Sequence, residues 1–150
     1  MERDAEKMYK LILTKIVQPI LGKGSTYQND LLKTGKDLLG NRFHGVYPCD
    51  KIPKLTKRQP YCILNLDNSN QPGSHWVACM KVGKKVWLYD SFARKGSKIL
   101  PSLAKSGNGI VRDVDREDRE QTIIEENCGA RCIAWLCLCE KLGIKYGKLI

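Results

Sequence analysis

The feature of this sequence that most constrains its fold is a continuous apolar run near the C-terminal end. Residues 132–139 are eight consecutive apolar side chains, and Gly143 follows as a helix stop. A helix that is apolar on every face is a buried one, so we predict a core helix over 128–142. Asn127 stands just before this helix, where a side chain can cap it by accepting a backbone N–H of the first turn.

Cys128 opens the predicted helix, at the point where a polar loop gives way to the apolar run. The positive end of a helix dipole points at such a position and favours thiolate over thiol. Two interpretations stay open on this observation alone. Cys128 is either a reactive nucleophile or one of seven small apolar cysteines in a well-packed core.

Length and cysteine usage narrow the class of protein. A chain of 150 residues suits a single domain, 1–150, with residues 1–24 as an N-terminal helical extension. Because the first residues are charged and no apolar run approaches about 18 residues, we expect a protein that is neither secreted nor in a membrane. Seven cysteines are an odd number, and four lie on one predicted helix, so reduced thiols are expected. The sequence has no CxxC pair, which argues against a metal site.

The net charge of +10 is unevenly distributed along the chain. Residues 1–110 carry 19 Lys and Arg against 8 Asp and Glu, whereas residues 111–150 carry 7 against 8. This basic excess is explained by a solvated surface, or by a surface that binds a polyanion such as DNA.

Hydrophobic periodicity predicts the other elements. An amphipathic helix is expected over 5–20, with Met8, Leu11, Ile12 and Ile16 on its apolar side, ending at Pro19 and packing on the surface of the domain. Further elements are a helix over 29–39, a proline-broken loop over 41–60, strands over 61–66, 76–81, 85–89 and 110–114, and a short helix around 99–105.

The hairpin formed by 76–81 and 85–89 brings a histidine near an acid. If Val82 and Gly83 form a two-residue turn, His75 faces Asp90 and Cys79 faces Val86, which places the first pair at the open end of the hairpin. A three-residue turn would move the two side chains to opposite faces.

A cysteine hydrolase needs a base, an orienting acid and donors for an oxyanion. His75, Asp90 and Cys128 are the candidates for base, acid and nucleophile. The other histidine, His44, lies in the proline-broken loop without an apparent carboxylate, and we interpret it as a surface or packing residue. Gln121 can fold back so that its amide donates beside the backbone N–H of Cys128, although a glutamine in a charged loop is usually only solvated.

The order His, acid, Gln, Cys resembles that of the adenain-type maturation cysteine proteases of adenoviruses, whose relatives occur in virophages and polinton-like elements. The motifs are GSHW at 73–76, WLYDSF at 87–92 and Q-x6-CG at 121–129. The segment LLGNRFHGVYPCDKIP at 38–53 is also similar, so the resemblance covers roughly residues 38–142. The adenoviral enzymes have glutamate where this chain has Asp90, but aspartate is usual in the wider group that includes ubiquitin-like-protein proteases.

This resemblance implies an α+β fold in which a mainly antiparallel central sheet packs against a buried helix that starts at the nucleophilic Cys128, with further helices at the N-terminus. It implies cleavage of viral capsid or other structural precursors, often beside glycine, during maturation in the virion and the infected cell. Trp76, which follows the histidine as in that family, would line the cleft. No cofactor is required chemically, although DNA or an activating peptide is an expected regulator, and nothing predicts a dimer.

Two alternatives remain at this point. The same catalytic order serves isopeptidases that remove ubiquitin or a ubiquitin-like modifier. The second alternative is a DNA-binding or capsid-associated protein without catalytic activity, which the basic excess favours.

Overall fold

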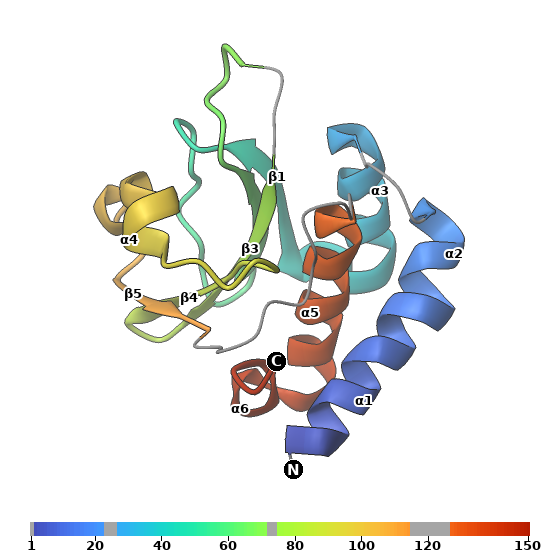
Figure 1. The fold of residues 1–150 in the computed structure, drawn as a ribbon. Coiled ribbons are helices and arrows are strands. Elements are labelled where there is room, and N and C mark those ends of the chain that lie inside the picture. Colours follow the sequence, from blue (N-terminus) through green and yellow to red (C-terminus); the bar gives the residue numbers. More distant parts are fainter. Residues whose placement is uncertain (1, 23–26, 72–74, 115–126) are drawn as a thin grey trace.

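The computed structural model describes residues 2–22, 27–71, 75–114 and 127–150, and it places a five-stranded sheet between two layers of helices (Figure 1). The strands are β1 Phe43–Pro48, β2 Tyr61–Asn65, β3 Trp76–Val82, β4 Lys85–Tyr89 and β5 Ile110–Asp113, side by side in that order. The two central pairings are antiparallel, whereas β1 pairs with β2 and β4 with β5 in parallel. The predicted α+β class is confirmed, but the sheet is mixed rather than mainly antiparallel.

Strand β1 lies inside the stretch that was predicted to be a loop throughout. Its buried positions do not alternate regularly, and it ends on Pro48. As an edge strand it has a neighbour on one side only, so a proline there is tolerated although it lacks an N–H. The prediction of a loop over 41–60 is therefore wrong in its first part, whereas β5 confirms the strand expected over 110–114.

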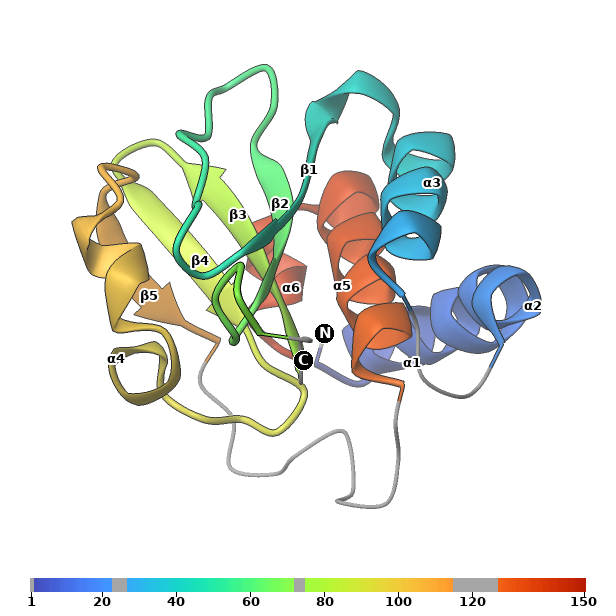
Figure 2. The ribbon, with the colours of Figure 1, turned by 90° about the horizontal axis from the view of Figure 1, so that it is seen from above.

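Helices cover both faces of the sheet (Figure 2). One face carries α5 Cys128–Leu142, with α1 Glu2–Ile12, α3 Gln28–Leu39 and α6 Ile144–Gly147 beside it, and the other carries α4 Gly96–Ile99 and the 3₁₀ segment η3 Pro101–Lys105. Because successive strand residues point to opposite faces, the sheet buries two separate apolar clusters. Ile63 and Ala78 join the cluster of α5, whereas Cys62 and Cys79 join that of η3.

Helix α5 is buried throughout its apolar run, as predicted: all residues of 132–139 are buried. It ends at Gly143, whose φ of +83° is a left-handed conformation that glycine adopts without strain. Asn127 occupies the N-cap position, but the predicted side-chain cap is not formed. Its backbone is not extended, with φ −105° and ψ 26°, and its Oδ1 accepts a hydrogen bond from Arg131 Nε at 3.0 Å.

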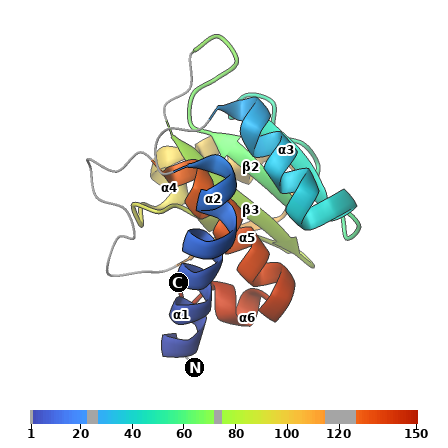
Figure 3. The ribbon, with the colours of Figure 1, turned by 90° about the vertical axis from the view of Figure 1, so that its right-hand side faces the viewer.

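The N-terminal helix is longer than predicted (Figure 3). After α1 it continues through a π-helical segment, η1 Leu13–Val17, and then through α2 Gln18–Leu21, so that Pro19 does not end it. The irregular N–H pairing around a π segment is compatible with a proline, which has no N–H to donate. Within the described ranges, no helix combines the length and apolar character needed to cross a bilayer.

The buried face of this helix also differs from the prediction. The residues in the core are Ala5, Tyr9, Ile12, Leu13 and Val17. Of the predicted apolar side only Ile12 is among them, whereas Met8, Leu11 and Ile16 are exposed. The buried face of residues 5–17 therefore packs in the main core with α5, and the expectation of a helix packed on the surface of the domain is wrong.

Helix α3 confirms the second predicted helix and approaches β1 closely. A Cβ at Gly35 would overlap the ring of Phe43, so only glycine allows this contact. The remaining short element before the sheet is the 3₁₀ segment η2 Gly40–Arg42.

Strands β3 and β4 form the predicted hairpin, but the turn lies one residue later. Val82 pairs with Lys85, so the turn residues are Gly83 and Lys84. Gly83 has φ +60°, which suits the first turn position of a hairpin where glycine is favoured.

This later turn changes the pairing of the two strands. Cys79 faces Leu88 and not Val86, a shift of two residues from the prediction. A shift of two preserves the face to which each side chain points, whereas a shift of one would reverse it. His75 and Asp90, just beyond the two strand ends, are therefore diagonal neighbours on one face and not a directly opposed pair.

Candidate active site

His75 and Asp90 lie side by side where β3 begins and β4 ends. His75 Nε2 and Asp90 Oδ1 are 2.6 Å apart, and both side chains are buried. The structure thus brings together the two residues that the sequence paired, through a register that differs from the predicted one. Because Nε2 bonds the carboxylate, Nδ1 is the ring nitrogen that is left for another partner.

The Asp90 carboxylate uses both of its oxygens. Oδ1 also accepts the backbone N–H of Phe92 at 3.2 Å, while Oδ2 accepts the backbone N–H of Arg94 at 3.1 Å and its Nε at 2.8 Å. Burial raises the pKa of Asp90, but the hydrogen bonds from His75 and Arg94 outweigh it and lower the pKa to about 2. Asp90 is therefore an anion at neutral pH.

Cys128 is the first residue of α5 and is hydrogen-bonded to His75. Burial raises the pKa of its thiol, but the hydrogen bond and charge of His75 outweigh this, assisted by backbone hydrogen bonds with Trp76 and Gly129. The net effect lowers the pKa of Cys128. Gly129 belongs to the first turn of α5. Its backbone hydrogen bond to Cys128 is therefore a specific contact through which the helix start stabilises the thiolate, as predicted.

The other cysteines with a resolved shift behave in the opposite way. The pKa is raised at Cys49, Cys79, Cys132, Cys137 and Cys139. Cys137 is as exposed as Cys128, at 8%, yet burial raises its pKa to about 11. Neighbouring groups, and not exposure, therefore distinguish Cys128.

His75 stands between the carboxylate and the thiol. Burial lowers the pKa of the imidazole, but the hydrogen bonds to Asp90 and Cys128 outweigh it and raise the pKa overall. A raised imidazole pKa next to a lowered thiol pKa favours an ion pair of imidazolium and thiolate.

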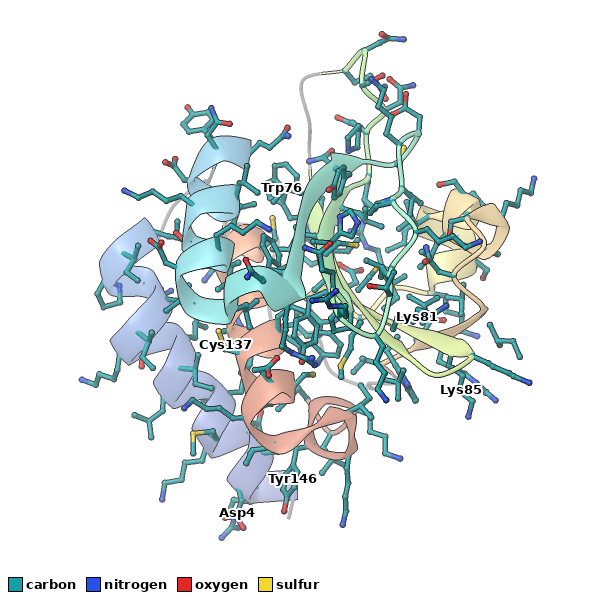
Figure 4. The ribbon with its side chains drawn as sticks, turned by 180° about the vertical axis from the view of Figure 1, so that it is seen from behind. Asp4, Trp76, Lys81, Lys85, Cys137 and Tyr146 are labelled. Atoms are coloured by element: carbon teal, nitrogen blue, oxygen red, sulfur yellow. The ribbon has the colours of Figure 1, made fainter. Side chains whose placement is uncertain are left out.

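The remaining predicted site residues have different outcomes. Trp76 begins β3, is half-buried and packs against the cluster of α5 (Figure 4). Gln121 lies outside the described residues. His44 is on β1, where its Nδ1 is 2.7 Å from the Tyr47 hydroxyl.

Two residues of the site were missed by the sequence analysis. The Phe92 ring packs on the His75 ring with centroids 4.9 Å apart, and the Arg94 guanidinium lies 5.0 Å from the Phe92 ring centre. The only sequence signal was position, because both residues follow Asp90 within four residues in the segment DSFAR.

Among the residues that the structure describes, no group of three or more His, Cys, Asp or Glu side chains could hold a metal ion. In comparisons with known proteins, no protein-family model and no curated protein matches this chain.

Proposed function

We propose that this chain is a cysteine peptidase in which Cys128 is the nucleophile, His75 the base and Asp90 the orienting acid. The observation that supports this proposal best is the buried pair of His75 and Asp90, joined at 2.6 Å, with Cys128 hydrogen-bonded to the same imidazole. A nucleophile, a base and a group that orients the base are the three parts of an activated thiol.

The chemistry follows from these positions. His75 takes the thiol proton, and the Cys128 thiolate attacks the carbonyl carbon of the scissile peptide bond to form a tetrahedral intermediate. The imidazolium then gives its proton to the leaving nitrogen, which breaks the C–N bond and leaves an acyl-enzyme. Asp90 stabilises the imidazolium throughout and keeps its Nε2 occupied, so that Nδ1 serves the reaction.

Deacylation reuses the same groups. His75 takes a proton from water, the hydroxide attacks the thioester carbonyl, and Cys128 leaves as thiolate. In both halves of the reaction the Gln121 amide and the backbone N–H of Cys128 would donate to the oxyanion.

The role of Gln121 has its own test. Removal of one oxyanion donor costs about 10²- to 10³-fold in rate, so Gln121→Ala is expected to lose about this much turnover. The variant should remain folded and should keep the alkylation rate of Cys128, because the donor acts on the transition state and not on the thiolate. A slower alkylation rate would instead assign Gln121 to the activation of the thiol.

The substrates we propose are viral capsid or other structural precursor polypeptides, cut beside glycine. This part of the proposal comes from the sequence motifs around His75, Asp90 and Cys128, which resemble those of adenain-type maturation proteases.

The test is co-expression of the chain with a candidate capsid precursor, followed by identification of new peptide termini. The native protein should generate defined termini, enriched beside glycine, and Cys128→Ala should generate none. Cys137→Ala is the matched control, because Cys137 lies on the same helix with the same 8% exposure. Equal cleavage by the native protein and Cys128→Ala would refute the proposal.

An isopeptidase acting on ubiquitin or a ubiquitin-like modifier is the second candidate, and Asp90 favours it because aspartate is usual in that group. Modifier–fluorophore conjugates assayed beside a glycine-containing peptide separate the two activities. Release of the fluorophore without peptide cleavage would favour the isopeptidase.

A further inference from the structure

We propose that Arg94 is a positioning residue of this site, which fixes the orientation of the Asp90 carboxylate. Its positive charge also offsets part of the effect that the negative charge of Asp90 has on His75. The inference rests on the proposed function of His75, Asp90 and Cys128.

The chain makes a tight turn to bring Arg94 back to Asp90. The backbone N–H of Ala93 donates to the Asp90 carbonyl oxygen at 2.8 Å, which closes the turn. Ala93 has φ +58°, a conformation that residues with a Cβ seldom adopt and that persists where surrounding contacts enforce it. The turn directs both the backbone N–H and the side chain of Arg94 at the same oxygen, Oδ2.

Arg94 can fix the orientation of the carboxylate because the two oxygens of Asp90 have different side-chain partners. Oδ1 faces His75 Nε2, while Oδ2 accepts the hydrogen bonds from Arg94. A carboxylate held at both oxygens cannot rotate about its Cβ–Cγ bond without breaking charged hydrogen bonds. Arg94 therefore keeps Oδ1 in place while the imidazole gains and loses a proton.

Contacts of Phe92 with both Arg94 and His75 reinforce this geometry. The guanidinium of Arg94 lies 5.0 Å from the Phe92 ring centre, and the Phe92 ring lies 4.9 Å from that of His75. Cation–π contacts of this kind hold a guanidinium against one face of a ring. Arg94 thus restrains the imidazole through Phe92 as well as through Asp90.

Arg94 also sets the electrostatic balance of the site. Asp90 and His75 interact electrostatically with each other. The other titratable or charged groups around the pair are Cys128 and Cys132 of α5, and Arg94 after β4. The positive charge of Arg94 opposes protonation of the imidazole. Without it, the full charge of Asp90 would act on His75 and hold the proton there to higher pH.

The test is the pH dependence of iodoacetamide labelling at Cys128, read by mass spectrometry, in the native protein and in Arg94→Gln. The upper inflection, where the imidazolium loses its proton, should move to higher pH by about half a unit or more in Arg94→Gln. Arg94→Lys, which keeps the charge, should restore the native inflection. In peptide hydrolysis, turnover should fall several-fold in Arg94→Gln while KM stays the same.

Arg42→Gln is a matched control. Arg42 also makes a 2.8 Å ion pair through Nε, to Glu140, and also covers an aromatic ring, that of Tyr61 at 5.3 Å, with a side chain 46% exposed against 43% for Arg94. It should leave the profile unchanged.

Two results would overturn the inference: labelling profiles of Arg94→Gln and the native protein that superimpose, or a change in KM alone, which would make Arg94 a substrate contact. If Arg94→Gln fails to fold, Arg94→Met takes its place in the labelling experiment, because methionine also removes both the charge and the side-chain hydrogen bond to Oδ2. A native protein whose Cys128 labels no faster than Cys137 would instead refute the proposed function itself, so the two failures are told apart.

Discussion

At the scale of single residues, Cys128 and Cys137 form a natural comparison within one helix. Both are 8% exposed, but His75 lowers the pKa of the first, whereas burial raises that of the second to about 11. With exposure equal, the larger thiolate fraction should make Cys128 the more reactive of the two thiols.

We therefore expect iodoacetamide at neutral pH to label Cys128 first and to leave Cys137 unlabelled over the same time. The measurement is peptide mass spectrometry of the folded protein, with His75→Ala as the variant that removes the lowering group. In His75→Ala the preference for Cys128 should disappear. Labelling spread evenly over all seven cysteines of the native protein would contradict the activated thiol.

Asp90 links the site to the stability of the fold. Its pKa is about 2 in the folded protein against an ordinary value of 3.8. A lowered carboxyl pKa stabilises the fold above pH 3.8, and this contribution is lost as the pH falls through about 2. Asp90→Asn should therefore reduce the free energy of unfolding by about 2 kcal/mol at neutral pH.

Urea unfolding of the native protein and Asp90→Asn at a series of pH values checks this expectation. The difference between the two should shrink from about pH 4 towards pH 2. Asp4→Asn, at an exposed position of α1, is the control and should show no loss of unfolding free energy comparable to that of Asp90→Asn at neutral pH (Figure 4). A difference that stays constant down to pH 2 would mean that Asp90 acts by shape and not by charge.

The sequence allowed three of the site residues to be predicted, because each has a chemistry that few other residues in the chain can supply. With only two histidines present, the base was nearly fixed, and the helix start selected Cys128 among seven cysteines. Arg94 could not be predicted, since arginine is common in this chain and its contact with Asp90 depends on the left-handed backbone of Ala93. No sequence pattern indicates that conformation at an alanine.

At the scale of elements, α5 and the N-terminal helix show that a helix prediction succeeds where one packing arrangement is available and fails where two are. Helix α5 is apolar on all faces and could only be buried. The N-terminal helix is apolar on two sides, with Tyr9 and Val17 on one and Leu11 and Ile16 on the other, so its sequence left the buried side undecided. The π segment over 13–17 also changes the phase of the helix, which a fixed helical period cannot anticipate.

The side that was buried connects the N-terminal helix to the site. The hydroxyls of Tyr9 and Tyr89 are 2.9 Å apart in the core, and the Tyr89 ring stacks on Trp135 of α5 at 5.3 Å. Tyr89 is the residue before Asp90. Helix α1 therefore supports the end of β4 from which the acid extends.

Tyr9→Phe removes this hydrogen bond and keeps the ring, and we expect it to cost about 1 to 2 kcal/mol of unfolding free energy. Turnover should also fall, because the end of β4 becomes less constrained. Tyr27→Phe, at a tyrosine that is 77% exposed, is the control and should change neither quantity. A chain that begins at Tyr27 and keeps native stability and activity would refute the structural role of α1.

At the scale of the whole molecule, the candidate active site and a group of lysines lie at opposite ends of the sheet (Figure 4). Trp76 and the catalytic candidates lie where β3 begins, whereas Lys81 and Lys85 lie at the opposite end, beside the hairpin turn. The strand between them spans roughly 20 Å, since each residue of a strand advances about 3.3 Å. Charge changes at the turn therefore leave the proposed active site untouched.

Several basic segments meet at this opposite end, around the turn over 106–110. Lys81 Nζ donates to the Asn108 carbonyl oxygen at 2.8 Å, the Lys84 carbonyl accepts the Ile110 N–H at 2.9 Å, and the Lys54 side chain lies beside Gly107. Lys105 ends η3 immediately before the turn. We call the exposed lysines Lys54, Lys84 and Lys105 the basic end, and we propose that it binds DNA or a similar polyanion.

Lysine contacts to phosphate release counterions, so the affinity for duplex DNA should fall steeply with salt. Replacing the three lysines of the basic end by glutamine should weaken binding equally for all DNA sequences and reduce the slope of log K against log salt by about two to three. The matched control replaces Lys7, Lys10 and Lys15, three exposed lysines of the N-terminal helix, and should alter the slope much less. Fluorescence anisotropy at several salt concentrations measures both.

Cys128→Ala should bind as the native protein does, because the site and the basic end lie at opposite ends of the sheet. Equal loss in the two triple variants would show that net charge alone, and not this surface, attracts the polyanion.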